Sequence, residues 1–358
     1  MKKLFRIIVC LLAIALFGAC SVSRATVTPT VSVPEAWYVF SEAETKTLAS
    51  LKQVDDYPLY VMQYYQDYAS GRTFRLPTPQ EADRAPGWGC SLFAVLLDED
   101  HLLFGRNFDF KFSPAVLVFT DPPDGYASVS MSDIAFLNFS NQTAARLMDL
   151  PLEERAGLLG APRFLFDGMN EHGLVVALAA VPQADTLADP SKKRITGLEL
   201  IRAVLDHAHD VDEAVDLIRG YNVDLRGGLP LHYLLADAKG QAVLVEFYQG
   251  EMRVLENEQP WHSATNFVHS AVEDPQGNCW RYDRINDRLN ETQGLLDSNS
   301  AMELLSQVAQ KSGESPTQWS VVYQMARREM AIAMGMDYAN VQTFRLSDFQ
   351  LPDYWDPR

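Results

Sequence analysis

One cysteine stands at the head of a predicted strand, and charged residues lie on the strand that follows it. Cys90 precedes an apolar run over 91–97, and a second run over 102–108 is predicted to fold back on it as a hairpin. Arg106 and Asp109 lie sixteen and nineteen positions after the cysteine, so the hairpin returns them toward it. A thiol becomes a nucleophile near neutral pH only if a neighbour lowers its pKa or takes its proton. A guanidinium beside the sulfur would favour the reactive thiolate.

The peptide bond before this cysteine could supply a base. If the chain were cut between Gly89 and Cys90, the freed α-amine, with an ordinary pKa of about 8, could accept the thiol proton. The carboxylate of Asp109 could then hold the ammonium form of that amine. One residue would serve as both nucleophile and base.

The first residues predict export. Basic residues precede an apolar run over 7–17, which is too short to span a membrane as a permanent helix. The run ends in small residues and Cys20, a pattern that resembles the bacterial lipobox, in which this cysteine carries the lipid. We expect residues 1–20 to be a signal peptide, and the mature protein to be a membrane-anchored lipoprotein on the periplasmic or cell-surface side. Cleavage after Ala19 or Ala25 would instead give a secreted protein.

Export leaves other interpretations of the central cysteine open. Beyond the signal peptide the sequence contains only Cys90 and Cys279, and an even pair in an oxidising compartment is a disulfide candidate. A bridge would abolish thiol chemistry, and an inert buried thiol also fits the pattern. Arg106 and Asp109, taken alone, could form a surface ion pair on the hairpin.

The acidic composition limits the kinds of partner. The formal net charge of −17 argues against nucleic acid or an anionic membrane surface as a partner. No glycine-rich phosphate loop stands between a predicted strand and a helix, and no group of His, Cys and carboxylate residues has metal-ligand spacing. We therefore expect no metal and no cofactor, and the sequence does not indicate the oligomeric state.

The segments before the cysteine predict a tether and a helix. Residues 21–40 are rich in Ser, Thr, Val and Pro without apolar periodicity, which suits a tether between a lipid anchor and a folded body. From Ser41 to about residue 70, a capping serine and apolar residues at helical spacing predict a helix. We expect residues 41–89 to form a helical segment and residues 90–358 to form the main domain.

The order of elements after the cysteine predicts an α+β fold. Strands, two helices, strands, one helix and strands again indicate antiparallel sheets with helices packed on their outer faces. Beyond the first hairpin, the expected strands are 164–166, 174–181, 231–238, 241–248, 251–256, 319–327, 329–334 and 343–346, and the expected helices are 197–207, 212–219 and 300–311. The stretch 111–160 shows no pattern that predicts an element.

Five segments, taken in order, resemble a known enzyme family. They are Cys90 followed by GRNFDF (105–110), DGMNEHGL (167–174), ATN (264–266), WRYDR (280–284) and TQWSVVY (317–323). From residue 90 to about residue 346 the chain resembles the N-terminal-nucleophile linear amide hydrolases. That group includes choloylglycine hydrolases, penicillin V acylases and acyl-CoA:6-aminopenicillanate acyltransferases. The resemblance implies a four-layer αββα fold, in which two antiparallel sheets lie between helices.

The resemblance also implies a function for each matching residue. Cys90 would be the nucleophile, Arg106 would support its thiolate, and Asp109 would position the α-amine. Arg281 would complete the polar network around the cysteine, although by itself it could belong to a solvated helix face.

Two further residues would hold the oxyanion. Asn266 would offer a side-chain N–H, although by itself it could simply stabilise a turn. The second donor comes from the strand after the NE-x-GL turn, where bile-salt-type enzymes have an asparagine and this chain has Ala180. A backbone N–H can serve there, so we expect amide hydrolysis but no preference for bile salts.

These features together predict an exported, lipid-anchored cysteine amidohydrolase that cleaves a small N-acyl amine or acyl-amino compound. By the same resemblance, residues 41–89 would be a pro-segment released by self-cleavage between Gly89 and Cys90. Cleavage would part the catalytic domain from a lipid on Cys20 unless the pro-segment stays bound. Two alternatives stay open: acyl transfer to an amine acceptor, and an uncleaved, non-catalytic binding lipoprotein with the same fold.

Overall fold

The computed structural model describes residues 39–68, 89–97, 102–225 and 229–349. Contacts group residues 40–358 into one structural unit and residues 1–39 into another, and every element named below belongs to the first. The predicted signal peptide, Cys20 and nearly all of the predicted tether lie outside the described residues. In the part of the chain that is described, no helix combines the length and the apolar character needed to cross a membrane.

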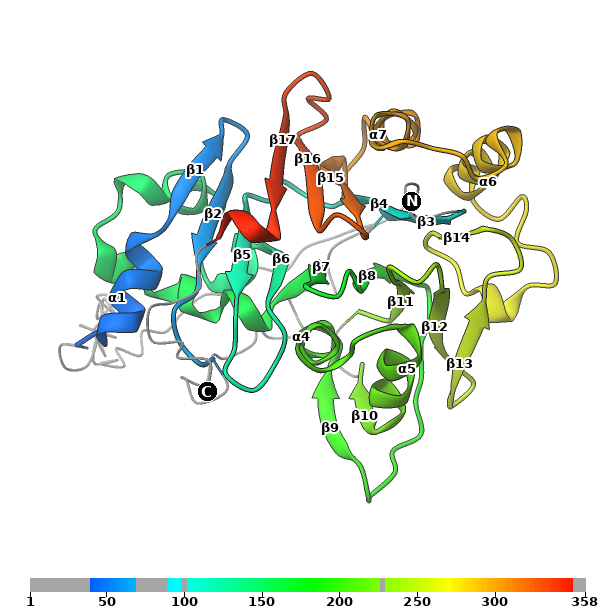
Figure 1. Ribbon diagram of the computed structural model, residues 1–358, viewed down its shortest axis with the longest axis horizontal. Helices are drawn as coiled ribbons and strands as arrows, with labels where there is room; N and C mark the ends of the chain where they lie inside the picture. Colours follow the sequence, from blue (N-terminus) through cyan, green and yellow to red (C-terminus); the bar gives the residue numbers. More distant parts are fainter. Residues whose placement is uncertain (1–38, 69–88, 98–101, 226–228, 350–358) are drawn as a thin grey trace, which may run out of the picture. The chain divides into compact units, whose positions relative to one another are not determined.

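Two sheets form the centre of the fold (Figure 1). Within the described residues, the larger sheet has nine strands, in spatial order β1 (Lys52–Asp55), β2 (Leu59–Gln63), β5 (Ala115–Thr120), β6 (Ser128–Asp133), β7 (Leu165–Asn170), β8 (Val175–Ala180), β11 (Leu231–Ala236), β12 (Ala242–Tyr248) and β13 (Glu251–Glu256). The smaller sheet has six, in the order β14 (Trp261–Ala264), β3 (Gly89–Leu96), β4 (Leu102–Asp109), β15 (Thr317–Gln324), β16 (Glu329–Met334) and β17 (Val341–Arg345). Neighbouring strands in both sheets are antiparallel, except that β2 and β5 run parallel. A separate parallel pair joins β9 (Lys193–Thr196) to β10 (Tyr221–Asp224).

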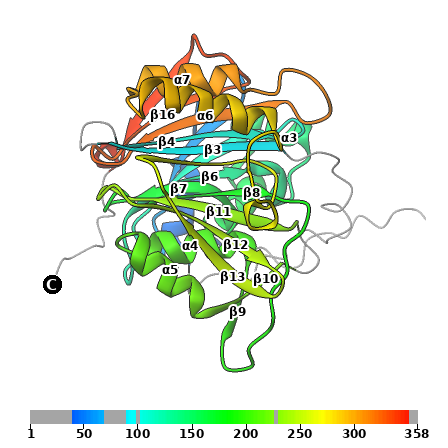
Figure 2. The ribbon, with the colours of Figure 1, turned by 90° about the vertical axis from the view of Figure 1, so that its right-hand side faces the viewer.

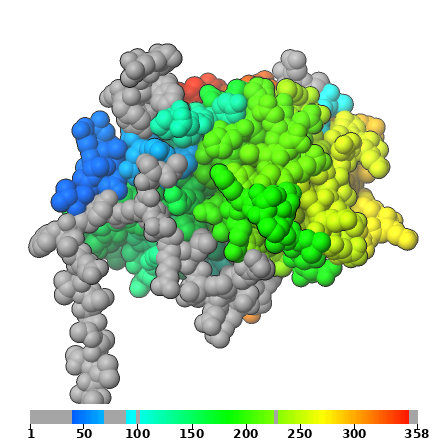
Figure 3. Space-filling view, turned by 90° about the horizontal axis from the view of Figure 1, so that it is seen from below, coloured from blue at the N-terminus to red at the C-terminus, as the bar shows by residue number. Residues whose placement is uncertain are grey.

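Helices cover the outer faces of both sheets. α4 (Gly197–His207) and α5 (Val211–Arg219) lie against the larger sheet, while α6 (Trp280–Thr292) and α7 (Ser298–Gln307) lie against the smaller one. Figure 2 shows the four layers in succession, and Figure 3 views the molecule from the side of α4 and α5. The shorter helices are α1 (Glu42–Ala49), α3 (Asn141–Ala144) and the 3-10 segments Ile134–Leu137, Leu147–Asp149, Leu152–Arg163, His269–Ala271 and Leu346–Asp348. The predicted αββα architecture is confirmed.

The helix that covers the centre of the larger sheet follows from its local sequence. Thr196 caps α4 and forms a reciprocal capping box with Glu199. The apolar residues of its inner face are buried, namely Leu200, Ile201, Val204 and Leu205. The predicted helix over 197–207 is confirmed, and the predicted helix over 212–219 is confirmed to within one residue as α5.

The hairpin that carries the cysteine is buried at every position of β3 and β4. Alternate side chains of β3 enter different cores, because Leu92 and Ala94 lie between the two sheets whereas Phe93 and Val95 pack beneath α6 and α7. Burial on both faces explains why the run after Cys90 is almost continuously apolar. The cysteine itself is fully buried.

The expectation of a helix from residue 41 to about residue 70 is wrong beyond its first two turns. Ser41 does cap a helix, with a capping box to Glu44, but α1 ends at Ala49. β1 and β2 follow, and β2 pairs with β5 through five consecutive positions. Tertiary pairing therefore overrides the helical spacing of the apolar residues in this segment. The stretch before the cysteine contributes two strands to the larger sheet.

The region 111–160 contains elements that the sequence did not predict, and residues 280–292 form a further unpredicted helix, α6. β5 reads AVLVFT, a buried run rich in β-branched and aromatic residues, and β6 reads SVSMSD, in which serine alternates with apolar residues. Both are strand patterns, although the second is weak. At the C-terminal side, α7 ends at Gln307, four residues before the predicted end.

A buried carboxyl group ends β6. Asp133 is fully buried, and its Oδ1 accepts the N–H of Ala135 at 2.9 Å, which caps the 3-10 segment that follows. Its Oδ2 has no hydrogen-bond partner among the described residues. Burial, partly offset by hydrogen bonds from Ala135 and Ser113, raises the pKa of Asp133 to about 7.

We predict that Asp133→Asn stabilises the protein near pH 8 and has little effect near pH 4. A carboxyl group whose pKa is raised on folding holds its proton in the folded chain while the unfolded chain releases it, so stability falls as the pH rises between the two pKa values. Asn keeps an oxygen for the cap without a charge, and the free energy of unfolding should rise by about 2–3 kcal/mol near pH 8. Urea denaturation near pH 4, 6 and 8 measures this difference. An effect that does not change with pH would contradict the prediction.

Candidate active site

The predicted site residues lie at one end of the strands of the two sheets, where several strands begin or stop. They come from five separate elements. Cys90 is the second residue of β3, Arg106 and Asp109 lie on β4, Ala180 ends β8, Asn266 follows the end of β14, and Arg281 is the second residue of α6. The structure brings all six together.

The predicted hairpin is confirmed, with a register that sets the first part of the site. Gly89 lies opposite Asp109, Cys90 opposite Phe108, and Leu92 opposite Arg106. Asp109 therefore lies one pair before the level of the cysteine on the neighbouring strand, and Arg106 lies two pairs after it. The short loop between the strands makes this placement a local property of the sequence.

Arg106 lies beside the sulfur. Its Nη2 is 3.8 Å from Sγ of Cys90, and its Nη1 donates to the carbonyl of Phe166 at 2.6 Å and pairs with the carboxylate of Asp167. Arg106 and Asp167 are both fully buried. Tyr323 donates to Asp167 Oδ1 at 2.5 Å, which fixes the carboxylate from the smaller sheet. Asp167 was quoted only as part of a motif, and its pairing with Arg106 was not predicted.

The surroundings of the cysteine keep its thiol protonated in the uncut chain. Burial raises the pKa of Cys90, and the opposing effect of the Arg106 guanidinium does not cancel it; Asp109 adds to the rise. The buried sulfur is thus next to a cation, but it is not a preformed thiolate. A base is needed before the sulfur can act as a nucleophile.

Asp109 is held by three side chains. Thr317 donates to its Oδ1 at 2.6 Å, while Gln310 Nε2 and Arg281 Nη1 each donate to its Oδ2 at 3.1 Å. Burial raises the pKa of Asp109 in spite of the neighbouring Arg281. Gln310 and Thr317 are functional candidates that the sequence analysis missed, since Thr317 was quoted only as part of a motif.

Asn266 and Arg281 bind the backbone of the cysteine. Oδ1 of Asn266 accepts the N–H of Cys90 at 2.7 Å and Nη2 of Arg281 at 2.8 Å. Nη1 of Arg281 donates to the Cys90 carbonyl oxygen at 2.6 Å. These contacts fix the N–H and the carbonyl of the cysteine on the side of β14.

Ala180 and Asn266 are arranged as a pair of oxyanion donors would be. Asn266 Nδ2 donates one hydrogen to the carbonyl oxygen of Ala180 at 2.7 Å. Val181 N–H bonds the carbonyl of Pro230, so the next pair, Ala180 and Leu231, is a non-hydrogen-bonded pair of the antiparallel ladder. The Ala180 N–H therefore points away from β11, to the same side as its carbonyl and toward Asn266. An amide N–H from each residue can converge on one oxygen atom.

The two cysteines do not form a disulfide. Cys90 is a buried free thiol, and Cys279 is a partly exposed free thiol that directly precedes α6. The disulfide alternative is therefore wrong for this structure. Cys279 nevertheless lies close to the site in the sequence, because Arg281 in the first turn of α6 belongs to the site.

An aromatic cluster borders the cysteine on the inner side of the smaller sheet. Phe108, which lies opposite Cys90, stacks on Trp319 at 4.0 Å between ring centroids and meets Phe166 edge-on at 5.0 Å. Phe136 continues the cluster, with its ring centroid 5.1 Å from that of Phe166 and 6.2 Å from that of Phe110. Phe136 is partly exposed, so the cluster extends from the core toward the surface.

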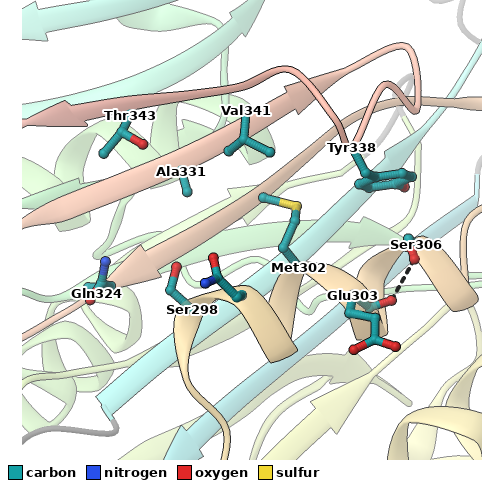
Figure 4. A pocket seen from close by; sticks show the side chains of 10 residues that line it. Ser298, Met302, Glu303, Ser306, Gln324, Ala331, Tyr338, Val341 and Thr343 are labelled. Carbon is teal, nitrogen blue, oxygen red and sulfur yellow. Dashed lines mark hydrogen bonds between the residues drawn. The ribbon is translucent and has the colours of Figure 1, made fainter.

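A separate hollow of about 550 Å³ lies on the outer face of the smaller sheet, between α7 and β15–β17 (Figure 4). Its lining residues are Ser298, Asn299, Met302, Glu303, Ser306, Gln324, Ala331, Tyr338, Val341 and Thr343. None of the six predicted site residues is among them. The hollow is therefore distinct from the polar cluster around the cysteine.

Comparison with solved structures identifies the fold. The conjugated bile acid hydrolase of Clostridium perfringens, solved as a variant, matches with a TM-score of 0.53 and 16% identity over 73% of this chain and 94% of that chain. The penicillin V acylase of Agrobacterium tumefaciens matches with a TM-score of 0.53 and 17% identity over 74% of this chain and 88% of that chain. At these identities the likeness shows a shared N-terminal-nucleophile hydrolase fold.

Comparison of the sequence with family profiles gives the family. The profile of the linear amide C–N hydrolases, choloylglycine hydrolase family, matches residues 90–281. The match begins at Cys90 and ends at Arg281, and so includes all six predicted site residues. This chain therefore belongs to the choloylglycine hydrolase family of linear amide C–N hydrolases, enzymes that act on carbon–nitrogen bonds other than peptide bonds.

Proposed function

We propose that this hydrolase is a cysteine amidohydrolase with Cys90 as its nucleophile, activated by cleavage of its own chain between Gly89 and Cys90. One observation carries the proposal: Arg106, Asn266 and Arg281 contact the sulfur, the N–H and the carbonyl oxygen of one buried residue. An inert structural thiol needs no such set of polar partners, and burying them is costly unless each is paired.

The activating step requires only groups of this chain and water. The thiol of Cys90 adds to the carbonyl carbon of Gly89, and its proton passes to the nitrogen of Cys90 as the carbon–nitrogen bond breaks. Water then hydrolyses the thioester, which leaves a carboxylate on Gly89 and a free thiol and α-amine on Cys90. Asp109 lies against Gly89 and can approach the new ammonium group.

The amide substrate then meets a complete acyl-transfer site. The α-amine takes the thiol proton, the thiolate attacks the amide carbonyl, and Asn266 Nδ2 and the Ala180 N–H hold the oxyanion. The α-amine next protonates the departing amine, and water releases the acid from the thioester. Arg106 stabilises the thiolate, because its Nη2 faces the sulfur.

The aromatic cluster favours an apolar acyl group. Phe108 shares the face of Cys90, and Phe166 and the partly exposed Phe136 extend this aromatic cluster toward the surface. Ala180 offers no side-chain donor at the oxyanion position, which supports a substrate other than a bile salt. We therefore assign small N-acyl amines or acyl-amino compounds with an apolar acyl part as the substrate class.

Lipid anchoring at Cys20 and export are compatible with cleavage if the N-terminal piece stays bound. Tyr68 donates to Asp206 of α4 at 2.7 Å, and Tyr64 donates to the Leu159 carbonyl at 2.7 Å. These bonds join the segment before the cleavage point to the part after it. A lipid on the first piece would then still hold the second at the membrane.

We predict that the protein expressed from residue 21 gives, after reduction, a fragment that starts at Cys90, and that Cys90→Ala stays full length and inactive. The alanine variant has no nucleophile for either reaction. Intact-mass analysis and release of acid from N-acyl p-nitroanilides with aromatic and aliphatic acyl groups measure the two activities. Added amines distinguish hydrolysis from acyl transfer, because an acceptor would yield a new amide.

Cys279→Ala is the matched control, since it removes the other described thiol and should change neither cleavage nor hydrolysis. Hydrolysis by Cys90→Ala at the rate of the unmodified protein would remove this cysteine from the mechanism. An uncut but folded chain without hydrolytic activity would favour the binding lipoprotein instead.

We predict that Asn266→Ala lowers kcat by roughly 10²–10³-fold with a much smaller change in KM, because one oxyanion donor is lost only where negative charge develops. The rate is measured per cleaved molecule, with the cleaved fraction counted by mass and by thiol titration. Asn290→Ala, on the exposed side of α6, is the control and should behave as the unmodified protein. A change confined to KM would indicate that Asn266 binds substrate without holding the oxyanion.

A further inference from the structure

The position before the cysteine lies in a compartment where any side chain would meet Gln310 and Asp109. Gly89 is buried, and a Cβ added to it would lie 2.0 Å from Nε2 of Gln310, 2.8 Å from Oδ2 of Asp109 and 3.0 Å from Cβ of Asp109. Contacts this short require the neighbouring atoms to move. The compartment is therefore formed by two side chains, one of which has no place in the mechanism above.

Four hydrogen bonds hold Gln310 in place. Its Nε2 donates to Asp109 Oδ2 at 3.1 Å and to the Ser315 carbonyl at 3.3 Å. Its backbone N–H donates to Thr317 Oγ1 at 2.9 Å, and its carbonyl accepts the Thr317 N–H at 3.0 Å. A side chain at residue 89 could displace the Gln310 amide only by breaking both side-chain hydrogen bonds.

The carbonyl of Gly89 points toward β4, the strand that carries Asp109, the hydrogen-bond partner of Gln310. Cys90 N–H donates to Asn266 and Leu96 N–H donates to the Pro260 carbonyl, so even-numbered residues of β3 turn their N–H and C=O groups toward β14. Odd-numbered residues, including Gly89, therefore turn theirs toward β4. Asp109 lies opposite Gly89 there, and its partner Gln310 lies beside it.

From this geometry we propose that Gln310 is a specificity-determining residue of self-cleavage: with Asp109 it selects glycine at residue 89 and positions the scissile carbonyl for attack by Cys90. The inference rests on the self-cleavage of the proposed function. It also separates the two reactions in space, because the oxyanion of cleavage forms on the β4 side of β3. The oxyanion of amide hydrolysis forms on the opposite side, between Asn266 and Ala180.

The test compares cleavage rates of four chains by intact mass over time: the unmodified protein, Gly89→Ala, Gln310→Ala and the double variant. Gly89→Ala should slow cleavage by about 10–100-fold, since displacement of a reacting group by about 1 Å has an effect of that size. The double variant should recover roughly tenfold over Gly89→Ala, because the largest clash is removed. Independent defects in the two single variants would instead add, and the double variant would then be cut more slowly than Gly89→Ala.

Gln307→Ala is the matched control. Gln307 lies three residues earlier and contacts Arg284 and Glu303 at the outer end of α7, so its loss should leave cleavage unchanged and should not rescue Gly89→Ala. Thermal unfolding midpoints of all variants identify any chain that fails to fold. If Gly89→Ala alone fails to fold, recovery of both folding and cleavage in the double variant still supports the compartment.

The outcomes distinguish this inference from the function on which it rests. Equal cleavage of the unmodified protein and Gly89→Ala would overturn the inference alone. A double variant that is cut no faster than Gly89→Ala would do the same. An unmodified chain that is never cut would overturn self-cleavage and, with it, this inference.

Discussion

The buried charge of Arg106 is the constraint on which the site depends. A guanidinium removed from water is costly unless it is paired and hydrogen-bonded, and removing one partner from such a pair typically costs about 3–5 kcal/mol. Here the partner is Asp167 of β7, which in turn accepts hydrogen bonds from Tyr323 and Trp319 of β15. One cation beside the sulfur therefore ties the larger sheet to the smaller sheet directly behind the cysteine.

A second buried pair completes the site from the other side. Arg281 reaches from α6 to Asp109 and to the carbonyl of Cys90, so the same guanidinium links a helix, both hairpin strands and the peptide group of the cysteine. Both pairs exist in the uncut chain, where burial keeps the thiol protonated. The polar framework is thus built before cleavage, and cleavage adds the one missing group, an amine in place of an amide.

How much of this site the sequence predicts depends on how local each contact is. Arg106 and Asp109 were found because a hairpin fixes their register to Cys90 within twenty residues. Asn266, Arg281 and Ala180 were named only through the resemblance to a family, since no periodicity relates a loop, a helix start and a strand end. Asp167, Gln310 and Thr317 contact residues from about sixty to more than two hundred positions away, and nothing local marks them.

The same difference between local and long-range contacts explains how much of the fold the sequence predicts. The four layers, the helices α4 and α5 and the strand meander were predicted, because their patterns are strong and local. The segment before the cysteine was misread because β2 owes its conformation to β5, more than fifty residues later. Export and lipid attachment at Cys20 stay predictions, since those residues lie outside the described part of the chain.

The position of β2 in the sheet bears on the consequence of a cut before Cys90. Leu59, Tyr60 and Met62 of this strand are fully buried, and β2 covers the edge of β5 with a ladder of backbone hydrogen bonds. Separating the two pieces would expose these side chains, each worth about 1.5–3 kcal/mol of burial, and would leave an open strand edge. The cut chain should therefore behave as one body of two pieces. In a lipid-anchored protein this arrangement reconciles a free N-terminal cysteine with attachment to a membrane, because the anchor and the nucleophile can lie on different chains of the same fold.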